Sequence, residues 1–261
     1  MIPFTHKPSR LKVSLQKKEL TIGTWLTIPH RSVVEIFGKS GFDWVVIDLE
    51  HAPIDIEQTA DLIAHIQGNG MQALVRVCKN EEVIIKRVLD AGADGIVVPM
   101  IKNKEEAKNA VAHSYYPPRG NRGVGLNRAQ HYGEGFESYK KWLNDNVVII
   151  AQIEHIDAIE NLDEILSVEG IDGTIIGPYD LSSSMGFPGD YNRPDVKDAL
   201  QSYITRGNKA NKPLGYHVIE SDSLFSIEKI QQGYSLIAFS IDFFFLGDRA
   251  KSELKKIKEL K

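Results

Sequence analysis

The 261-residue sequence lacks the features of a secreted, membrane-bound or disulfide-stabilised protein. Its single cysteine, Cys78, excludes an internal disulfide and fits a reducing compartment. There is no run of about 18 apolar residues, so no transmembrane helix is expected. The opening MIPFTHKPSRLKVSL has no apolar core of a signal peptide. We therefore expect a cytoplasmic protein with no membrane partner.

The sequence also has no large excess of either positive or negative charge. The formal net charge of −4 gives no basic excess, so no nucleic-acid partner is expected. An anionic substrate would need a local arginine or metal ion. Fixed-period repeats, low-complexity tracts and domain linkers are missing too, which favours one domain over residues 1–261, with 1–18 as an N-terminal arm or leading helix. Cys78 follows a predicted strand. It is interpreted either as a reactive thiol or as a small buried or half-buried hydrophobic residue.

Short apolar runs alternate with amphipathic segments along the chain. This pattern is typical of repeated βα units. Runs such as Val45-Val46-Ile47 do not alternate apolar with polar residues, as expected for parallel strands buried on both faces. The length is close to the roughly 250 residues of a (β/α)8 domain. We predict an α/β fold, a single-domain TIM barrel, with strands near 22–27, 44–48, 72–77, 95–98, 147–153, 171–176, 214–218 and 236–240.

The segments between these strands predict helices, and Asn80 caps the helix that follows the third strand. One connection, 102–146, is too long for a simple return, and long loops are usually functional or mobile. Its Gly/Arg-rich part, 115–125, has two interpretations, an anion or subunit contact and an ordinary loop. The predicted helices cover 32–38, 55–66, 80–90, 105–112, 156–166, 221–231 and 248–260.

Four polar residues lie just beyond four different apolar runs, at the ends of predicted strands: His51, Arg76, Glu154 and Asp180. In a (β/α)8 barrel the carboxyl ends of the strands meet at one rim, where the chemistry takes place. Neighbouring strands lie about 5 Å apart, so Glu154 and Asp180 can share one cation. Carboxylate ligands suit Mg²⁺ or Mn²⁺, with Co²⁺ as a further candidate. The alternative is that each carboxylate caps a helix or pairs with a basic residue.

His51 is the candidate general base, because a neutral imidazole accepts protons near neutral pH. Asp48 or Glu50 would orient its ring. The alternative is a structural histidine, since His30 and His217 also lie near strand ends.

Arg76 is the candidate group for holding a carboxylate or a developing enolate oxyanion. A structural salt bridge with Glu50 or Asp90 is the alternative. A Schiff-base enzyme would instead need a lysine with a lowered pKa, and only Lys79 and Lys102 follow strand ends closely. A catalytically silent barrel serving as a binding subunit is a further alternative.

Several segments together resemble the HpcH/HpaI aldolase family of metal-dependent class II pyruvate aldolases. They occur in the family's order and span nearly the whole chain, from about residue 23 to 242. The segments are DLEHAP, ALVRV, AGADGIVVPM, PPRGNRGVG, IAQIEHIDAIENLDEI and GPYDLSSSMG.

The resemblance implies a (β/α)8 barrel that reversibly cleaves 4-hydroxy-2-oxo acids to pyruvate and an aldehyde. It implies a homo-oligomer, usually a hexamer built as a trimer of dimers, with the last helix exchanged between subunits. It assigns the metal to Glu154 and Asp180, the base to His51 with help from Asp48, the carboxylate or enolate contact to Arg76, a substrate or metal contact to Gln152, the pyruvate carboxylate contact to the backbone at Pro178 and Tyr179, and a residue lent across the interface to Asp90.

Two positions depart from the family pattern. His155 stands where the family often has Thr, and Tyr179 stands where it often has Ala. Neither change removes a predicted ligand, so the pyruvate half is expected to be intact and the aldehyde pocket reshaped. Acyl-CoA lyase chemistry, as in citrate-lyase-like relatives, is a second reading, although no clear CoA-binding signature is present.

Overall fold

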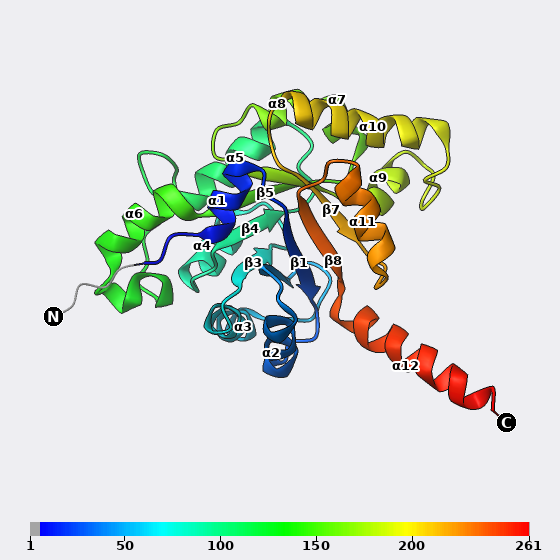
Figure 1. Ribbon diagram of the computed structural model, residues 1–261. Helices are drawn as coiled ribbons and strands as arrows, with labels where there is room; N and C mark the ends of the chain where they lie inside the picture. The colour runs from blue at the N-terminus through cyan, green and yellow to red at the C-terminus, as the bar shows by residue number, and fades with distance from the viewer. Residues whose placement is uncertain (1–5, 261) are drawn as a thin grey trace.

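Eight parallel strands close into a barrel in the computed structural model, which describes residues 6–260. Each strand pairs with the next in the chain and β8 pairs with β1, so the predicted TIM barrel is confirmed (Figure 1). Residues 1–5 of the predicted arm lie outside the described part. The strands are β1 (Thr21–Leu26), β2 (Trp44–Asp48), β3 (Gln72–Arg76), β4 (Gly95–Val98), β5 (Val148–Ile153), β6 (Gly173–Ile176), β7 (Leu214–Val218) and β8 (Leu236–Ile241).

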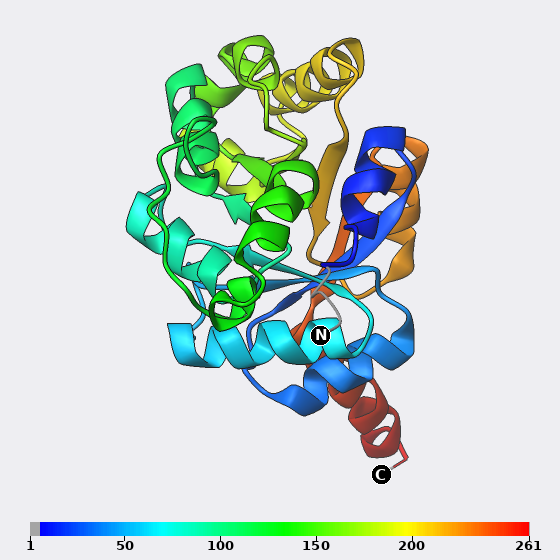
Figure 2. The same cartoon turned by 90° about the vertical axis from the view of Figure 1, so that its left-hand side faces the viewer.

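Helices surround the barrel, except that the last one projects away from it (Figures 1 and 2). They are α1 (Arg10–Lys17), α2 (Arg31–Ser40), α3 (Ile56–Gly68), α4 (Glu82–Asp90), α5 (Lys104–Ser114), η1 (Arg128–Gly133), α6 (Phe136–Asn146), α7 (Ile156–Glu160), α8 (Leu162–Leu166), α9 (Pro178–Ser184), α10 (Pro194–Lys209), α11 (Ser223–Gln231) and α12 (Asp242–Lys258). Within residues 6–260, no helix is long and apolar enough to cross a membrane.

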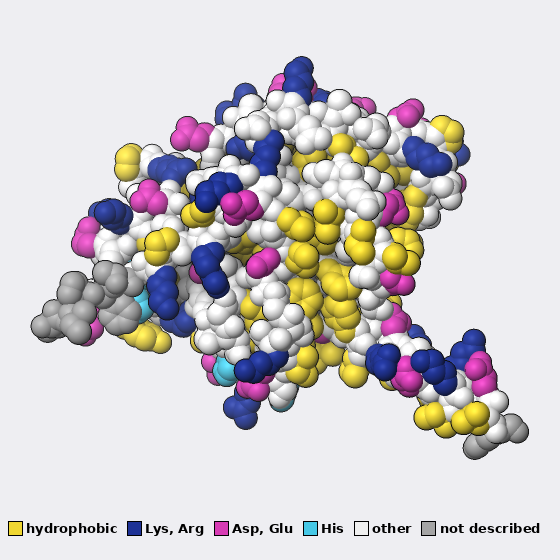
Figure 3. Space-filling view, in the orientation of Figure 1, with side chains coloured by type: hydrophobic (Ala, Val, Ile, Leu, Met, Phe, Trp, Pro, Cys, Tyr) yellow, Lys and Arg dark blue, Asp and Glu magenta, His cyan; other side chains and the backbone are white. Residues whose placement is uncertain are grey.

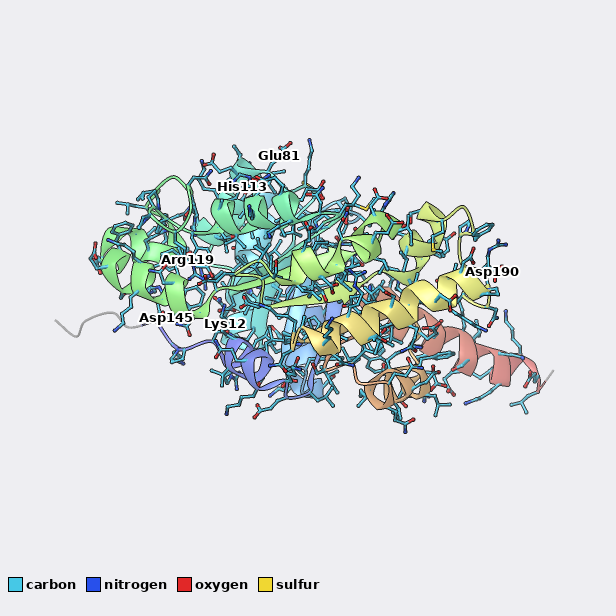
Figure 4. All side chains as sticks on the ribbon, turned by 90° about the horizontal axis from the view of Figure 1, so that it is seen from above. Lys12, Glu81, His113, Arg119, Asp145 and Asp190 are labelled. Carbon is cyan, nitrogen blue, oxygen red and sulfur yellow. The ribbon has the colours of Figure 1, made fainter. Side chains whose placement is uncertain are left out.

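Apolar side chains fill the inside of the barrel, and α1 adds Leu11 and Leu15 to that interior cluster. Of the two predictions for the first residues, the structure therefore has a leading helix. Lys12 of α1, labelled in Figure 4, is buried and donates to the Val147 carbonyl at 2.9 Å and to Asp172 at 2.5 Å. These contacts fix α1 to the barrel end opposite the predicted rim.

Strand β1 depends on a glycine at its centre. A Cβ atom at Gly23 would overlap the indole ring of Trp44, which fills that space from β2. Gly23 pairs with Trp44 in the β1–β2 register, and the absence of a side chain at Gly23 makes room for the Trp44 ring. Trp25, two residues on, is on the same face of β1 and belongs to the same interior cluster.

Several local predictions were wrong. Helix α4 begins at Glu82, and Asn80 does not cap it. The side-chain amide of Asn80 donates to the Glu106 carbonyl instead. The predicted helix 156–166 is two short helices separated at Asn161. Cys78 is exposed rather than buried. The last helix begins at Asp242, earlier than predicted. The helices that were not predicted are η1, α6, α9 and α10.

Candidate active site

A cavity of about 520 Å³ opens at the carboxyl ends of the strands. Its lining includes Asp48, His51, Arg76, Gln152 and Asp180, from four different βα units. The sequence predicted that such residues would share one rim, and the structure brings them together there. Pro178 and Tyr179 also line this cavity, together with Trp25, Tyr191, Tyr216, His217 and Glu220.

Arg76 is the centre of the charged network. Asp48 and Arg76 are paired in the β2–β3 register, and the guanidinium donates to both Asp48 oxygens, from Nε at 2.9 Å and Nη2 at 2.7 Å. Its Nη1 lies 3.1 Å from Glu50 Oε2. The predicted salt bridge with Glu50 is thus present, whereas Asp90 is bound elsewhere. A bidentate contact fixes the plane of the guanidinium.

Burial and Arg76 act in opposite directions on these two acids. Burial alone would raise the pKa of Asp48, but the Arg76 hydrogen bonds and charge, with the backbone N–H groups of Glu50 and His51, hold it below the usual range. Burial raises the pKa of Glu50 despite the attraction of Arg76. Asp48 is therefore the ionised partner of Arg76, and Glu50 is the more easily protonated acid.

Glu154 is buried just beyond β5. Its Oε1 accepts the Met100 backbone N–H at 2.8 Å, and its Oε2 accepts the Gln152 side-chain amide at 2.7 Å. Burial, reinforced by the negative charges of Glu50 and Asp180, raises the pKa of Glu154 to about 7. The carboxylate is thus oriented by two donors in a place that favours its neutral form unless positive charge is added.

Asp180 approaches the same place from the next strand. It lies in the first turn of α9, which begins at Pro178 directly after Gly177. A Cβ atom at Gly177 would lie 3.1 Å from Glu154 Oε2, tighter than ordinary contact. Glycine therefore lets the β6–α9 turn pass close to the Glu154 carboxylate. Asp180 is exposed, unlike Glu154.

His51 stands at the mouth of the cavity, with a side chain 70% exposed. The nearest acid to its ring is Glu50, whose Oε2 lies 3.8 Å from Nε2. Asp48 accepts the backbone N–H of His51 at 3.4 Å, and its side chain is committed to Arg76. The predicted contact between Asp48 and the His51 ring is therefore not formed. Glu50, named from the sequence as a possible partner of His51 and of Arg76, lies beside both of them.

Comparison with known proteins is decisive at this point. The HpcH/HpaI aldolase/citrate lyase family matches residues 21–243. The chain belongs to the HpcH/HpaI family. It is 35% identical over 249 residues to 2-keto-3-deoxy-L-rhamnonate aldolase of Escherichia coli K12, covering 95% of this chain and 92% of that one. It is 39% identical over 209 residues to 5-keto-4-deoxy-D-glucarate aldolase of E. coli O139:H28, covering 80% and 81%.

Solved structures agree on the fold. An HpcH/HpaI aldolase/citrate lyase family protein from Burkholderia cenocepacia aligns with a TM-score of 0.89 and 31% identity, covering 95% of this chain and 98% of that one. A citrate lyase beta subunit from Mycobacterium tuberculosis, complexed with oxaloacetate and magnesium, aligns with a TM-score of 0.56 and 12% identity, covering 88% and 95%, and shares the fold alone. By its homology to named aldolases, this HpcH/HpaI protein is an aldolase, a carbon–carbon lyase.

Asp90 of the aldolase is held away from the cavity within its own chain. Arg122, itself fully buried, donates to Asp90 Oδ1 at 2.5 Å, and Gln130 donates to the same oxygen at 3.1 Å. Arg119, labelled in Figure 4, stacks on Tyr115 at 3.8 Å. Both arginines of the Gly/Arg-rich segment 115–125 are thus used in packing, which favours the ordinary-loop interpretation over an anion site.

The lysines of the Schiff-base alternative do not have the required environment. Lys79 is exposed and lies 2.6 Å from Glu81, whose hydrogen bond and charge raise the pKa of the lysine. A Schiff-base lysine needs the opposite shift. Neither Lys79 nor Lys102 lines the cavity within the described chain.

Three other histidines near strand ends have structural contacts. His30 caps α2 by accepting the Ser32 N–H at 3.2 Å, and His155 caps α7 by accepting the Asp157 N–H at the same distance. The departure at His155 is therefore a change of helix cap. His217 stacks on Trp25 inside the cavity.

The residues present fit a divalent cation. Asp48 and Glu50 contact the guanidinium of Arg76, and the charges of Glu50 and Asp180 both act on Glu154, so acids outnumber the one guanidinium at this end of the barrel. Gln152 Oε1, beside Glu154, is buried and has no hydrogen-bond partner among residues 6–260. In the same range, no group of three or more His, Cys, Asp or Glu side chains is arranged around a metal position. Two carboxylates with water and substrate oxygens are a normal Mg²⁺ shell.

Proposed function

We propose that this protein is a divalent-metal-dependent aldolase that cleaves 4-hydroxy-2-oxo acids, keto-deoxy acids among them, to pyruvate and an aldehyde. The observation that carries the proposal is that Asp180, Gln152 and the Arg76–Asp48 pair line one cavity, while Glu154 lies directly behind Gln152 and within electrostatic reach of Asp180. Its two E. coli relatives are named as aldolases of such acids.

Glu154 and Asp180 would hold Mg²⁺ or Mn²⁺, with Co²⁺ as a further candidate. The bound ion would supply Lewis acidity for the negative charge that develops on the 2-oxo group as the C3–C4 bond breaks. The Met100 and Gln152 contacts orient Glu154 for this role. Gln152 keeps its buried Oε1 for a donor from water or substrate.

Arg76 would bind the carboxylate or developing oxyanion of the pyruvate half. A guanidinium has five N–H groups, of which two donate to Asp48, while Glu50 lies 3.1 Å from Nη1 as an ion-pair partner. At least one N–H therefore remains on each Nη nitrogen. No side chain caps the start of α9, so the backbone amide of Tyr179, next to Pro178, also suits the substrate carboxylate.

His51 would remove the C4 hydroxyl proton through a water molecule and later return a proton to C3 of pyruvate. Its exposed position at the cavity mouth suits exchange with solvent. Glu50 rather than Asp48 would orient the ring, because Asp48 is engaged by Arg76.

The aldolase is also proposed to be a homo-oligomer, of the hexameric kind, in which α12 is exchanged between subunits. Helix α12 extends away from its own barrel (Figure 1). Leu246, Leu254 and Ile257 share one side of it and are 67%, 50% and 60% exposed. Hydrophobic side chains also gather on the face from which α12 departs (Figure 3). Asp90, fixed by Arg122, would reach a neighbouring site in such an assembly.

The metal requirement is tested by pyruvate release from a 4-hydroxy-2-oxo acid, coupled to lactate dehydrogenase. Stripping with EDTA should abolish release, and Mg²⁺ or Mn²⁺ should restore it. Glu154→Gln should lower kcat/KM by at least about 100-fold, whereas Glu137→Gln, on the surface of α6, should not. Full activity in excess EDTA would reject the proposal. Covalent trapping with pyruvate and borohydride would favour the Schiff-base alternative.

A further inference from the structure

The cavity extends past the charged network to a wall that the proposed chemistry does not use. Trp25 of β1 and His217 of β7 line this wall, with Tyr191 and Tyr216 beside them. The Arg76 guanidinium lies 5.3 Å from the Trp25 ring, so the wall adjoins the group assigned to the pyruvate half. The groups assigned to the pyruvate half and the metal come from other elements of the barrel, which leaves this wall for the aldehyde half.

Trp25 and His217 form a stacked pair with two unused polar atoms. Their ring centroids are 4.3 Å apart and their planes differ by 16°. Trp25 is 1% exposed. Trp25 Nε1 and His217 Nε2 are both buried and have no hydrogen-bond partner in the described part of the chain. Buried polar atoms are rarely left without a partner in native proteins, because the lost hydration is not replaced.

The two atoms have complementary roles. The His217 ring makes a hydrogen bond to the Ser240 backbone. Since Nε2 is without a partner, that bond uses Nδ1–H, and Nε2 of the neutral ring is an acceptor. Burial, with the nearby Arg76 charge, lowers the pKa of His217 to about 4, which keeps the ring neutral. Trp25 Nε1–H is a donor only, so a hydroxyl group, which both accepts and donates, satisfies the pair.

The cavity has little to offer a second carboxylate. Among the described residues that line it, Arg76 is the only lysine or arginine, and it is paired with Asp48 and Glu50. Glu220 lies on the same side as His217, at the end of β7, and adds negative charge. A carboxylate on the aldehyde half would lose its water without gaining a cation.

We propose that Trp25 and His217 bind a hydroxyl group on the aldehyde half of the substrate, a proposal that rests on the proposed function. The preferred aldehyde is then hydroxylated and carries no carboxylate. His217 is a specificity-determining residue, and the pair discriminates between aldehydes without touching the bond that breaks.

The test runs the reaction toward addition, with pyruvate and matched aldehydes. The wild type should have a higher kcat/KM for glycolaldehyde than for acetaldehyde, which lacks only the hydroxyl group. His217→Leu should lower that ratio about tenfold, the effect of one hydrogen bond to substrate. His217→Gln, which keeps a polar atom at the same reach, should recover most of it. Trp25→Phe provides a second variant that removes only the donor side of the pair.

Charge is tested with glyceraldehyde and tartronate semialdehyde, which differ in a CH₂OH or a carboxylate. The wild type should favour glyceraldehyde. An unchanged glycolaldehyde-to-acetaldehyde ratio of kcat/KM in both His217→Leu and Trp25→Phe would show that no substrate hydroxyl binds Trp25 Nε1 or His217 Nε2, and would overturn the inference. A wild-type preference for tartronate semialdehyde would overturn it too. Deuterium exchange into the pyruvate methyl group, measured with metal and no aldehyde, distinguishes a failure of the specificity proposal from a failure of the proposed function. If exchange occurs but the kcat/KM ratios of the variants equal those of the wild type, only the specificity proposal is overturned. If no exchange occurs, the proposed function is overturned as well.

Discussion

Single side chains in this site serve structure and chemistry together. Asp48 takes two N–H groups of Arg76 and also accepts the backbone N–H groups of Glu50 and His51. One buried carboxylate therefore fixes the guanidinium and the turn that carries the proposed base. Removing one partner of a buried ion pair leaves the other charge uncompensated, so Asp48 supports the site even though it is not the neighbour of the His51 ring.

His217 should make the stability of the protein depend on pH. Its pKa is about 4 in the folded state, because of burial and Arg76, against an ordinary value of 6.5. The unfolded chain therefore binds more protons between these pH values. Above about pH 6.5 the ring is neutral in both states, so His217 does not lower the free energy of unfolding. As the pH falls from 6.5 toward 4, the free energy of unfolding drops by about 3 kcal/mol because of this residue.

Urea unfolding at several pH values between 7.5 and 4.5 measures this dependence. Other groups titrate in the same range, so wild type is compared with His217→Gln, which has no titrating ring. The free energy of unfolding should fall less steeply in the variant, and the gap between the two proteins should narrow or invert at low pH. Parallel curves would show that His217 is not held neutral by its surroundings.

At the residue scale, the sequence predicted which side chains gather at the rim but not how they pair. Arg76 ends β3, His51 and Asp180 come after β2 and β6, and strand ends converge in a barrel. Spacing along the chain does not say which way a side chain turns. Asp48 was assigned to His51, close in sequence, but the β2–β3 register places it beside Arg76. Glu50 then takes the position near the His51 ring.

At the element scale, the His155 departure concerns the start of α7. Thr is a common N-cap residue, and here the imidazole Nδ1 accepts the Asp157 N–H at 3.2 Å in its place. We expect His155→Ala to lower the free energy of unfolding by about 1 kcal/mol, measured by urea denaturation. His155→Thr is the matched control and should retain most of that stability. An alanine variant as stable as the wild type would show that the cap contributes nothing.

The strands were more predictable than the helices for a physical reason. A barrel strand is buried on both faces, so it appears as an uninterrupted apolar run, as in β2 and β5. Helix α10 packs Val196, Ala199, Leu200, Tyr203 and Ile204 against the core at helical spacing, so its pattern is legible in the sequence although the helix was not predicted. Helix α9 has only seven residues and follows Gly177-Pro178, which indicate a turn as readily as a helix start. An apolar stripe as short as that of α9 is easily missed in a sequence.

The predicted helix cap at Asn80 was wrong because a polar side chain has more than one possible partner. Asn80 is a good cap residue by type, but its amide binds the Glu106 carbonyl in the next βα unit. That contact joins residues far apart in sequence, so local pattern cannot reveal it. The Asp55 capping box of α3, by contrast, uses only Gln58, within the same turn.

At the scale of the whole molecule, the barrel keeps stability and chemistry at opposite ends. Helix α1 closes one end with Leu11, Leu15 and the buried Lys12. The proposed metal ligands and Arg76 are at the other end. The aldehyde wall is built from β1 and β7, on elements different from those of the two metal ligands. Substrate preference can therefore change, as with Tyr179 and His217, while the pyruvate half is kept.

The exposed stripe of α12 gives the last prediction, on assembly. An isolated barrel gains nothing from a helix that extends into water with Leu254 and Ile257 exposed, so this stripe should be buried by another subunit. The double variant Leu254→Lys, Ile257→Lys should lower the mass measured by light scattering after size exclusion, because charges there oppose burial. Lys251→Gln with Lys258→Gln, on the same helix, is the control. An unchanged mass in the apolar-stripe variant, with the barrel's circular dichroism intact, would contradict exchange of α12.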